Sequence, residues 1–189
     1  MSDFGGLRVL SLESRRADLM EQLIRRHGGE PFVAPSVKEM PFEQHDEVHR
    51  WAERLFAGEF DLLVLMTGAG LTFLNDILAE RYPKEAFAEA LRRLTIVSRG
   101  PKPAAVLHEM GVSAKVMVPE PNTWREIVPI LAARPERRIA IQEYGRANAD
   151  LLAAVRALGA EVSPISIYRW TLPDDARPLR EAVRRIASR

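Results

Sequence analysis

The chain contains no cysteine. This excludes disulfide bonds and thiolate metal sites, and it fits a reducing compartment. No apolar run approaches the roughly 20 residues that a membrane-spanning helix needs. The first ten residues also lack the basic start and long apolar stretch of a signal peptide. We therefore expect a cytoplasmic protein with no membrane partner.

A large excess of charge is also missing, because the formal net charge is +1. No nucleic-acid partner is therefore expected. Residues 177–189 are a local exception, with five arginines against one glutamate, and a solvated helix face accounts for them. A chain of 189 residues has room for one ordinary domain or two small ones.

Strand and helix patterns alternate along the sequence. Strands are predicted at residues 7–12, 30–34, 61–66, 94–97, 114–118, 138–142 and 161–167. Helices are predicted at residues 15–27, 43–57, 69–81, 84–91, 101–110, 123–133, 148–158 and 173–189. This alternation predicts an α/β fold built on doubly wound parallel sheets.

The strands are distributed unevenly between two predicted domains. Five lie between residues 61 and 167, whereas the two before Pro35 cannot form a stable sheet alone. The last helix carries an apolar stripe that needs a sheet to cover, formed by Leu179, Ala182, Val183 and Ile186. We therefore expect a partial, discontinuous first domain and a complete second one. Their predicted boundaries are 1–36 plus 170–189, and 40–167, with crossings near 35–41 and 167–173.

Two histidines, His45 and His49, lie one helical turn apart in the segment HDEVH. Zinc proteases use this spacing, but with Glu directly after the first His and a third ligand elsewhere. Asp46 takes that place here. The sequence therefore favours a solvated helix face and no metal site.

The turn Thr67-Gly68-Ala69-Gly70 follows a continuously apolar strand and opens a helix. Backbone N–H groups at such a turn bind anions. Phe73 stands where a dinucleotide fingerprint has its third glycine, which disfavours a nucleotide cofactor. A carboxylate or phosphate site and a purely structural turn both remain open.

Three further turns follow predicted strands in the same way. Counting the Thr67 turn as the first, the second contains Ser98, Gly100 and Lys102, the third contains Thr123, and the fourth contains Tyr144 and Gly145. The carboxyl ends of parallel strands share one edge of a sheet, where ligands of α/β proteins bind. Several such turns suit a polyanionic ligand, although a structural role is equally open for Ser98 and Lys102.

The stretch IQEYGRANADLLAAVRALGAEVSPISIYRWTLPDD ends in an aromatic and basic cluster around Tyr168. By residue type alone, Tyr168 could simply pack a domain junction. The stretch nevertheless resembles the uroporphyrinogen-III synthase family. Three further segments add to the likeness: the opening strand with Ser14-Arg15-Arg16, LLVLMTGAG and SRGPKPAAVLHEMG.

The resemblance implies two flavodoxin-like α/β domains joined by a two-stranded linker. It implies a cyclising hydro-lyase of tetrapyrrole and heme biosynthesis. That enzyme converts hydroxymethylbilane to uroporphyrinogen III, with loss of water and inversion of ring D. No metal or organic cofactor is expected. The substrate carries eight carboxylates, which agrees with the presence of several turns whose backbone N–H groups could bind anions.

The resemblance also assigns residues. Tyr168 matches a tyrosine placed to assist departure of the substrate hydroxyl, and it is the expected catalytic residue. Gly68 replaces a serine of the family, and Pro103 stands where many members have threonine. The expected substrate-binding residues are Arg15, Thr67, Gly68, Ala69, Ser98, Gly100, Lys102, Thr123, Tyr144 and Gly145.

Family members continue for about another half-domain, so we expect a shortened chain with little synthase activity alone. Self-association through the incomplete first domain is one remedy for its open edges. The alternative is a non-catalytic ligand-binding module of a regulatory protein, which the replacements at Gly68 and Pro103 favour. Retention of Tyr168 favours the enzyme. A generic flavodoxin-like nucleotide binder is weakened because no phosphate fingerprint is present.

Overall fold

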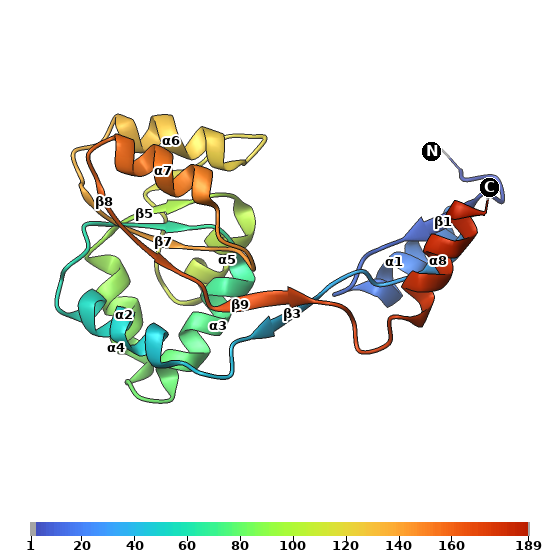
Figure 1. Ribbon diagram of the computed structural model, residues 1–189, viewed down its shortest axis with the longest axis horizontal. Helices are drawn as coiled ribbons and strands as arrows, with labels where there is room; N and C mark the ends of the chain where they lie inside the picture. Colours follow the sequence, from blue (N-terminus) through green and yellow to red (C-terminus); the bar gives the residue numbers. More distant parts are fainter. Residues whose placement is uncertain (1–2, 189) are drawn as a thin grey trace. The chain divides into compact units, whose positions relative to one another are not determined.

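The computed structural model describes residues 3–188, and the chain divides into two compact units (Figure 1). Unit 1 combines the residues up to Met40 with those from Trp170 onward, and unit 2 is Pro41–Arg169. Within residues 3–188, no helix is long and apolar enough to cross a membrane. The predicted end of the last helix at Arg189 lies outside the described residues.

Unit 2 contains a parallel five-stranded sheet, as the sequence predicted. Its strands are β4 (Leu62–Leu65), β5 (Thr95–Ser98), β6 (Val116–Met117), β7 (Arg138–Gln142) and β8 (Glu161–Ile165). The sheet order is β6-β5-β4-β7-β8. The order by chain position is therefore 3-2-1-4-5, whereas flavodoxin itself has 2-1-3-4-5. The switch point, where successive connections leave in opposite directions, lies between β4 and β7.

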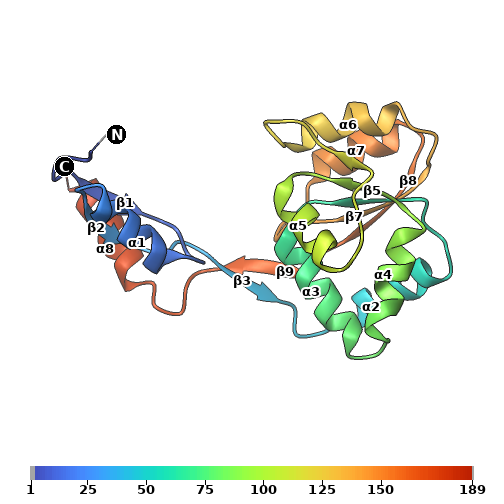
Figure 2. The same ribbon diagram turned by 180° about the vertical axis from the view of Figure 1, so that it is seen from behind.

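Helices cover both faces of this sheet (Figures 1 and 2). One layer contains α2 (Asp46–Phe56), α3 (Gly68–Ala79), α4 (Lys84–Arg92) and α5 (Pro101–Glu109), and the other contains α6 (Trp124–Ala132) and α7 (Ala149–Ala157). Alternate residues of β4 serve the two cores. Leu63 and Leu65 belong to the core on the α3 side, and Leu62 and Val64 to the core on the α6 side. This explains why the strand is apolar throughout.

Unit 1 is much smaller. Its parallel strands β1 (Arg8–Ser11) and β2 (Glu30–Val33) lie between α1 (Ala17–Arg26) and α8 (Arg177–Ala187), as both views show (Figures 1 and 2). The predicted apolar stripe of the last helix is only partly correct. Ala182 is buried, but Val183 and Ile186 are 58% and 62% exposed.

Two short strands connect the units, where the residue pattern had predicted only crossings. They are β3 (Lys38–Pro41) and β9 (Tyr168–Thr171), and they pair in a sheet of their own. The predicted helix start at Pro173 is wrong, because α8 begins at Arg177. The Asp175 carboxylate accepts a hydrogen bond from the Arg177 backbone N–H at 3.0 Å, which keeps the preceding residues in a turn.

Candidate functional site

A polar cluster lies at the switch point of the sheet, where the turns after β4 and β7 meet. Thr67 is the N-cap of α3, and its Oγ1 accepts a hydrogen bond from Gly70 N at 3.1 Å. The Thr67 backbone N–H donates to Gln142 Oε1 at 3.1 Å. Gln142 is fully buried at the end of β7. These bonds tie together turns that lie far apart in sequence.

Tyr168 joins this cluster from β9. Its side chain is 1% exposed, and its hydroxyl donates to Thr67 Oγ1 at 3.3 Å. The Tyr168 ring packs against Phe73 with the ring centroids 5.7 Å apart. Phe73 therefore has a packing role at the position where a dinucleotide fingerprint would need glycine. Thr67, Gln142 and Tyr168 are referred to below as the Thr67 cluster.

The glycines of the first turn allow close approaches to neighbouring elements. A Cβ atom added to Gly68 would lie 2.9 Å from the Lys102 carbonyl oxygen, and one added to Gly70 would collide with the Gln142 amide. Serine at position 68 would therefore require α5 to shift. Ala69, between them, is half-buried.

The second turn, after β5, is held by its own polar groups. Ser98 is fully buried, and its hydroxyl donates to the Gly100 carbonyl at 2.8 Å. With its amide nitrogen facing this turn, Asn122 donates to the Arg99 carbonyl at 2.8 Å. Lys102 is exposed in the first turn of α5. Ser98 thus shapes the turn, while Lys102 presents a cation beside it.

Thr123 forms a capping box at the start of α6. Its backbone N–H and its hydroxyl both donate to Glu126 Oε2, at 2.8 and 2.6 Å. The hydrogen bond from the Thr123 hydroxyl lowers the pKa of Glu126, despite the opposing effect of burial. The Thr123 hydroxyl is therefore engaged in holding the helix start.

The fourth turn, after β7, packs against the second. The Arg99 guanidinium lies over the Tyr144 ring, 5.3 Å from its centroid, and Asn148 Nδ2 donates to the Tyr144 hydroxyl at 3.3 Å. The buried carboxylate of Glu143 accepts hydrogen bonds from Asn148 N and Ser166 Oγ, at 3.1 and 2.8 Å. Gly145 has a φ of +38°, in the left-handed range that glycine adopts readily.

The predicted site residues thus fall into two groups. All except Arg15 belong to unit 2, at or just beyond the carboxyl ends of its strands. Arg15 belongs to unit 1, where its guanidinium forms an ion pair with Glu39.

Sequence reasoning did not single out Arg99, Gln142, Glu143 and Asn148 as individual site residues. Gln142 and Glu143 belong to the stretch IQEYG, in which only Tyr144 and Gly145 were expected site residues. A buried amide and a buried carboxylate next to a strand end could have flagged them, because such groups need hydrogen-bond partners.

The expectation that His45 and His49 lie on a solvated helix face is wrong. His49 is 3% exposed, and His45 is half-buried. The His49 ring packs near Tyr82, with the ring centroids 6.5 Å apart. Burial lowers the pKa of His49, and the nearby Arg81 lowers it further. The helix turns this face toward the end of α3, which the spacing of the histidines could not reveal.

Two crystal structures of uroporphyrinogen III synthase from the extremely thermophilic bacterium Thermus thermophilus resemble this chain. A mutant form has a TM-score of 0.71 and the wild type 0.62, and both are 26% identical to the chain. Each match covers 95% of this chain, and 69% and 68% of the respective crystallised chains. The likeness therefore extends over nearly all of this chain.

Similar sequences carry other names. The uncharacterised protein YjjA of Bacillus subtilis is 25% identical over 175 residues, covering 90% of this chain and 63% of that protein. A trigger factor of Bradyrhizobium diazoefficiens is 27% identical over 154 residues, covering 78% of this chain and 32% of that protein. The chain thus spans less than two thirds of the length of these curated relatives.

A family profile matches most of the chain. The profile described as "Uroporphyrinogen-III synthase HemD" matches residues 18–188, which include the Thr67 cluster and every predicted site residue except Arg15. Together with the two crystal structures, this match shows that the chain belongs to the uroporphyrinogen-III synthase family.

Proposed function

We propose that this chain binds the linear tetrapyrrole hydroxymethylbilane and cyclises it to uroporphyrinogen III, with inversion of ring D and loss of water. The observation that carries the proposal is the Thr67 cluster. It brings the Tyr168 hydroxyl to Thr67 Oγ1, at 3.3 Å, at the switch point of the sheet in a member of this family. Switch points are where open α/β sheets bind ligands.

In this proposal Tyr168 assists departure of the substrate hydroxyl. The carbon–oxygen bond breaks, its electron pair leaves with the oxygen, and that oxygen takes up a proton and departs as water. A phenol donor lowers the cost of this step by hydrogen bonding to the departing oxygen. To do so, the Tyr168 hydroxyl exchanges Thr67 Oγ1 for the substrate. Thr67 then serves to hold the phenol in the correct direction before the substrate arrives.

A substrate with eight carboxylates needs several cationic and N–H partners. Cationic side chains occur in the turns or first helical turns that follow β5, β6 and β7, at Arg99, Lys102, Arg125 and Arg146. The starts of α3 and α6 also point backbone N–H groups toward this edge of the sheet, whereas α5 has fewer because Pro101 and Pro103 have none. Spread along one edge, these groups suit a long polyanion better than a single phosphate.

The proposed binding residues divide by what their side chains contact. Lys102, Tyr144 and the backbone at Ala69 are proposed to contact the substrate, and Arg15 is also a proposed binding residue. Thr67 is proposed to position the Tyr168 phenol. The remaining residues are proposed to shape the turns, because their hydroxyls are already engaged or they have no side chain. These are Gly68, Ser98, Gly100, Thr123 and Gly145.

The domain division 1–36 plus 170–189, and 40–167, is part of the proposal. So are a cytoplasmic location and a reaction that needs no cofactor. The compact units, which divide at Met40 and Trp170, support these boundaries. The match to trigger factors covers only about a third of those proteins, so it does not support a trigger-factor function for this chain.

The alternative function is a ligand-binding module without catalysis. Gly68 favours it, because a side chain at this position would meet the Lys102 carbonyl at 2.9 Å, so the turn cannot hold the family's serine hydroxyl unless α5 moves. Such a module would bind the tetrapyrrole at the same edge of the sheet and leave it linear.

An isomer assay separates the two functions. The chain is incubated with hydroxymethylbilane, and the product with inverted ring D is quantified against an enzyme-free blank. Enrichment of that isomer supports the synthase, whereas binding measured by calorimetry without enrichment supports the module. If the chain neither enriches the isomer nor binds the bilane, both functions are overturned.

Tyr168→Phe tests the catalytic role, with Tyr82→Phe as the matched control. Removal of the Tyr168 hydroxyl should lower kcat about 10- to 100-fold with little change in KM, as expected when one donor to the departing oxygen is lost. Tyr82→Phe should leave both values unchanged. Unchanged kcat in Tyr168→Phe would remove this residue from the mechanism.

A further inference from the structure

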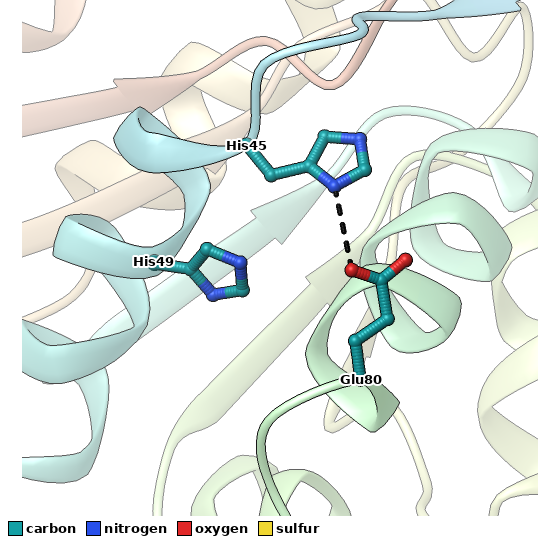
Figure 3. Close-up of side chains that lie close together, drawn as sticks. All are labelled: His45, His49 and Glu80. Carbon is teal, nitrogen blue, oxygen red and sulfur yellow. Dashed lines mark ion pairs between the residues drawn. The ribbon is translucent and has the colours of Figure 1, made fainter.

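Three side chains with metal-binding atoms meet where α2 begins and α3 ends (Figure 3). His45 is the N-cap residue of α2, His49 lies one turn further along, and Glu80 is the C-cap residue of α3. One donor atom from each lies within 4.8 Å of the others. His45 Nδ1 and Glu80 Oε2 are 3.7 Å apart. We propose that these three residues bind a divalent transition-metal ion, with Zn²⁺ fitting the donor set best.

The spacing is close to what a metal ion requires. Zn²⁺ binds histidine nitrogen and carboxylate oxygen at about 2.0–2.1 Å with tetrahedral geometry, which places neighbouring donors roughly 3.3 Å apart. The His45–Glu80 pair is near this value at 3.7 Å. The Glu80 side chain is 61% exposed and can move toward the ion without disturbing the core. Two imidazoles and a carboxylate also form a known zinc ligand set, with water in the remaining position.

The hydrogen bonding of His45 favours the tautomer that a metal needs. Its Nε2 lies 2.8 Å from the Phe42 carbonyl oxygen, which can only accept. Nε2 therefore carries the hydrogen, and Nδ1 keeps its lone pair on the side of Glu80. Metal-binding histidines commonly donate their other N–H to a carbonyl in this way, which also fixes the ring direction.

His49 supplies the second imidazole of the cluster. Its ring is 3% exposed, and Nδ1 has no hydrogen-bond partner within the described part of the chain. Figure 3 shows the other ring nitrogen, Nε2, directed toward the space between His45 and Glu80. A buried imidazole has lost its contacts with water, and a metal bond at Nε2 offsets part of that cost.

The surrounding charges oppose each other. Arg81 places a positive charge near His49, whereas Glu80 and Asp46 place negative charges there. Arg81 is exposed, so its side chain can turn toward solvent when a cation binds. The ion would join the first turn of α2 to the end of α3 and stabilise unit 2. This inference does not rest on the proposed synthase activity.

The test is zinc binding by the full chain, purified without a histidine tag and treated with a chelator. Calorimetry with Zn²⁺ alone should give one ion per chain, and saturating Zn²⁺ should raise the Tm because it binds the folded state. His45→Gln and Glu80→Gln should each weaken zinc binding at least about tenfold, as loss of a ligand requires. Both positions are partly exposed, so these variants should fold.

Matched controls come from the same chain. His108→Gln removes an exposed histidine near the end of α5, and Glu89→Gln removes an exposed glutamate of α4. Both should bind zinc as the unaltered chain does. The proposal is overturned if the unaltered chain takes up no stoichiometric zinc. It is also overturned if His45→Gln and Glu80→Gln bind as tightly as their controls.

Discussion

The two units of this chain are built from the same kinds of element, but they bury very different amounts of side chain. In unit 2, all four residues of β4 are fully buried. In unit 1, Leu10 of β1 is 37% exposed, and Leu7 just before that strand is 66% exposed. The difference follows from the number of strands. Five strands provide two faces for helices to cover, whereas two strands provide very little sheet surface on which helices can pack.

The comparison also separates local from long-range stabilisation. The helices of unit 1 have good local signals, such as an acidic residue in the first turn of α1 and arginines in its last turn. Yet the residues of this unit buried within the described chain are only Ser11, Ile24, Ala34 and Ala182. Helix signals alone therefore do not produce a core, and most predicted site residues lie on the unit that has one.

Hydrogen exchange should give the largest contrast between the units. Amides of β4 and β7 should exchange only through unfolding of unit 2, whereas those of β1 and β2 should exchange at least about 100-fold faster through local opening. The reason is the small buried area of unit 1. Mass spectrometry of exchanged peptides measures both units in one sample. Equal protection in the two pairs of strands would contradict the comparison.

Matched leucine substitutions should give the next largest effect. Leu65→Ala removes a fully buried side chain of β4 and should lower the free energy of unfolding of unit 2 by about 3 kcal/mol. Leu10→Ala, in the half-covered β1, should lower that of unit 1 by less than about 1 kcal/mol. Urea titrations can be followed by the NMR indole signals of Trp51 and Trp124 for unit 2, and of Trp170 for unit 1. Similar losses would show that unit 1 is better packed than its exposed leucines indicate.

Substitution of two aspartates should give the smallest change in the free energy of unfolding. It is also the sharpest test of whether pairing between distant residues stabilises the fold. Hydrogen bonding to the Arg138 side chain lowers the pKa of Asp61 from 3.8, and this pair joins residues that lie before β4 and at the start of β7. Hydrogen bonding to Arg177, two residues away, lowers the pKa of Asp175 to about 2. A contact over two residues can also form in the unfolded chain, so it contributes little to folding.

The pH dependence follows from the direction of the Asp61 shift. A carboxyl whose pKa is lower in the folded state contributes stability above its unfolded pKa, and the contribution is lost as pH falls through the folded value. Asp61→Asn should therefore destabilise unit 2 at pH 7, and its difference from the unaltered chain should shrink as the pH falls below 3.8. Asp175→Asn should change the stability of unit 1 little at either pH. Urea titrations at about pH 7 and about pH 3 measure both, and an equal loss in the two variants would contradict the distinction.

Much of the fold could be predicted because its signals are local. The apolar run at β4, the glycine that ends α1 and the capping residues of α6 and α7 each report on nearby backbone. Parallel strands then place the turns after β4, β5 and β7 at a common edge. The errors occurred where a local pattern was incomplete, as at the exposed Val183 and Ile186 and at the start of α8.

The candidate site could be predicted only as a set of turns. Residues 67 and 168 are brought together by the strand order, which the periodicity of side chains does not contain. The same is true of His49, whose burial depends on the neighbouring end of α3. Residue type predicted a solvent-exposed surface at His49, but the packing of α2 next to the end of α3 buries its side chain.

By itself, the sequence determined the alternation of strands and helices, the two-faced burial of the central sheet and the likeness to one enzyme family. Only the tertiary structure decided that Tyr168 donates to Thr67, that Gly68 meets the Lys102 carbonyl and that two histidines face a glutamate. The physical reason is the range of the interactions. Backbone propensity and apolar periodicity act over a few residues, whereas these contacts depend on how distant elements cross and pack.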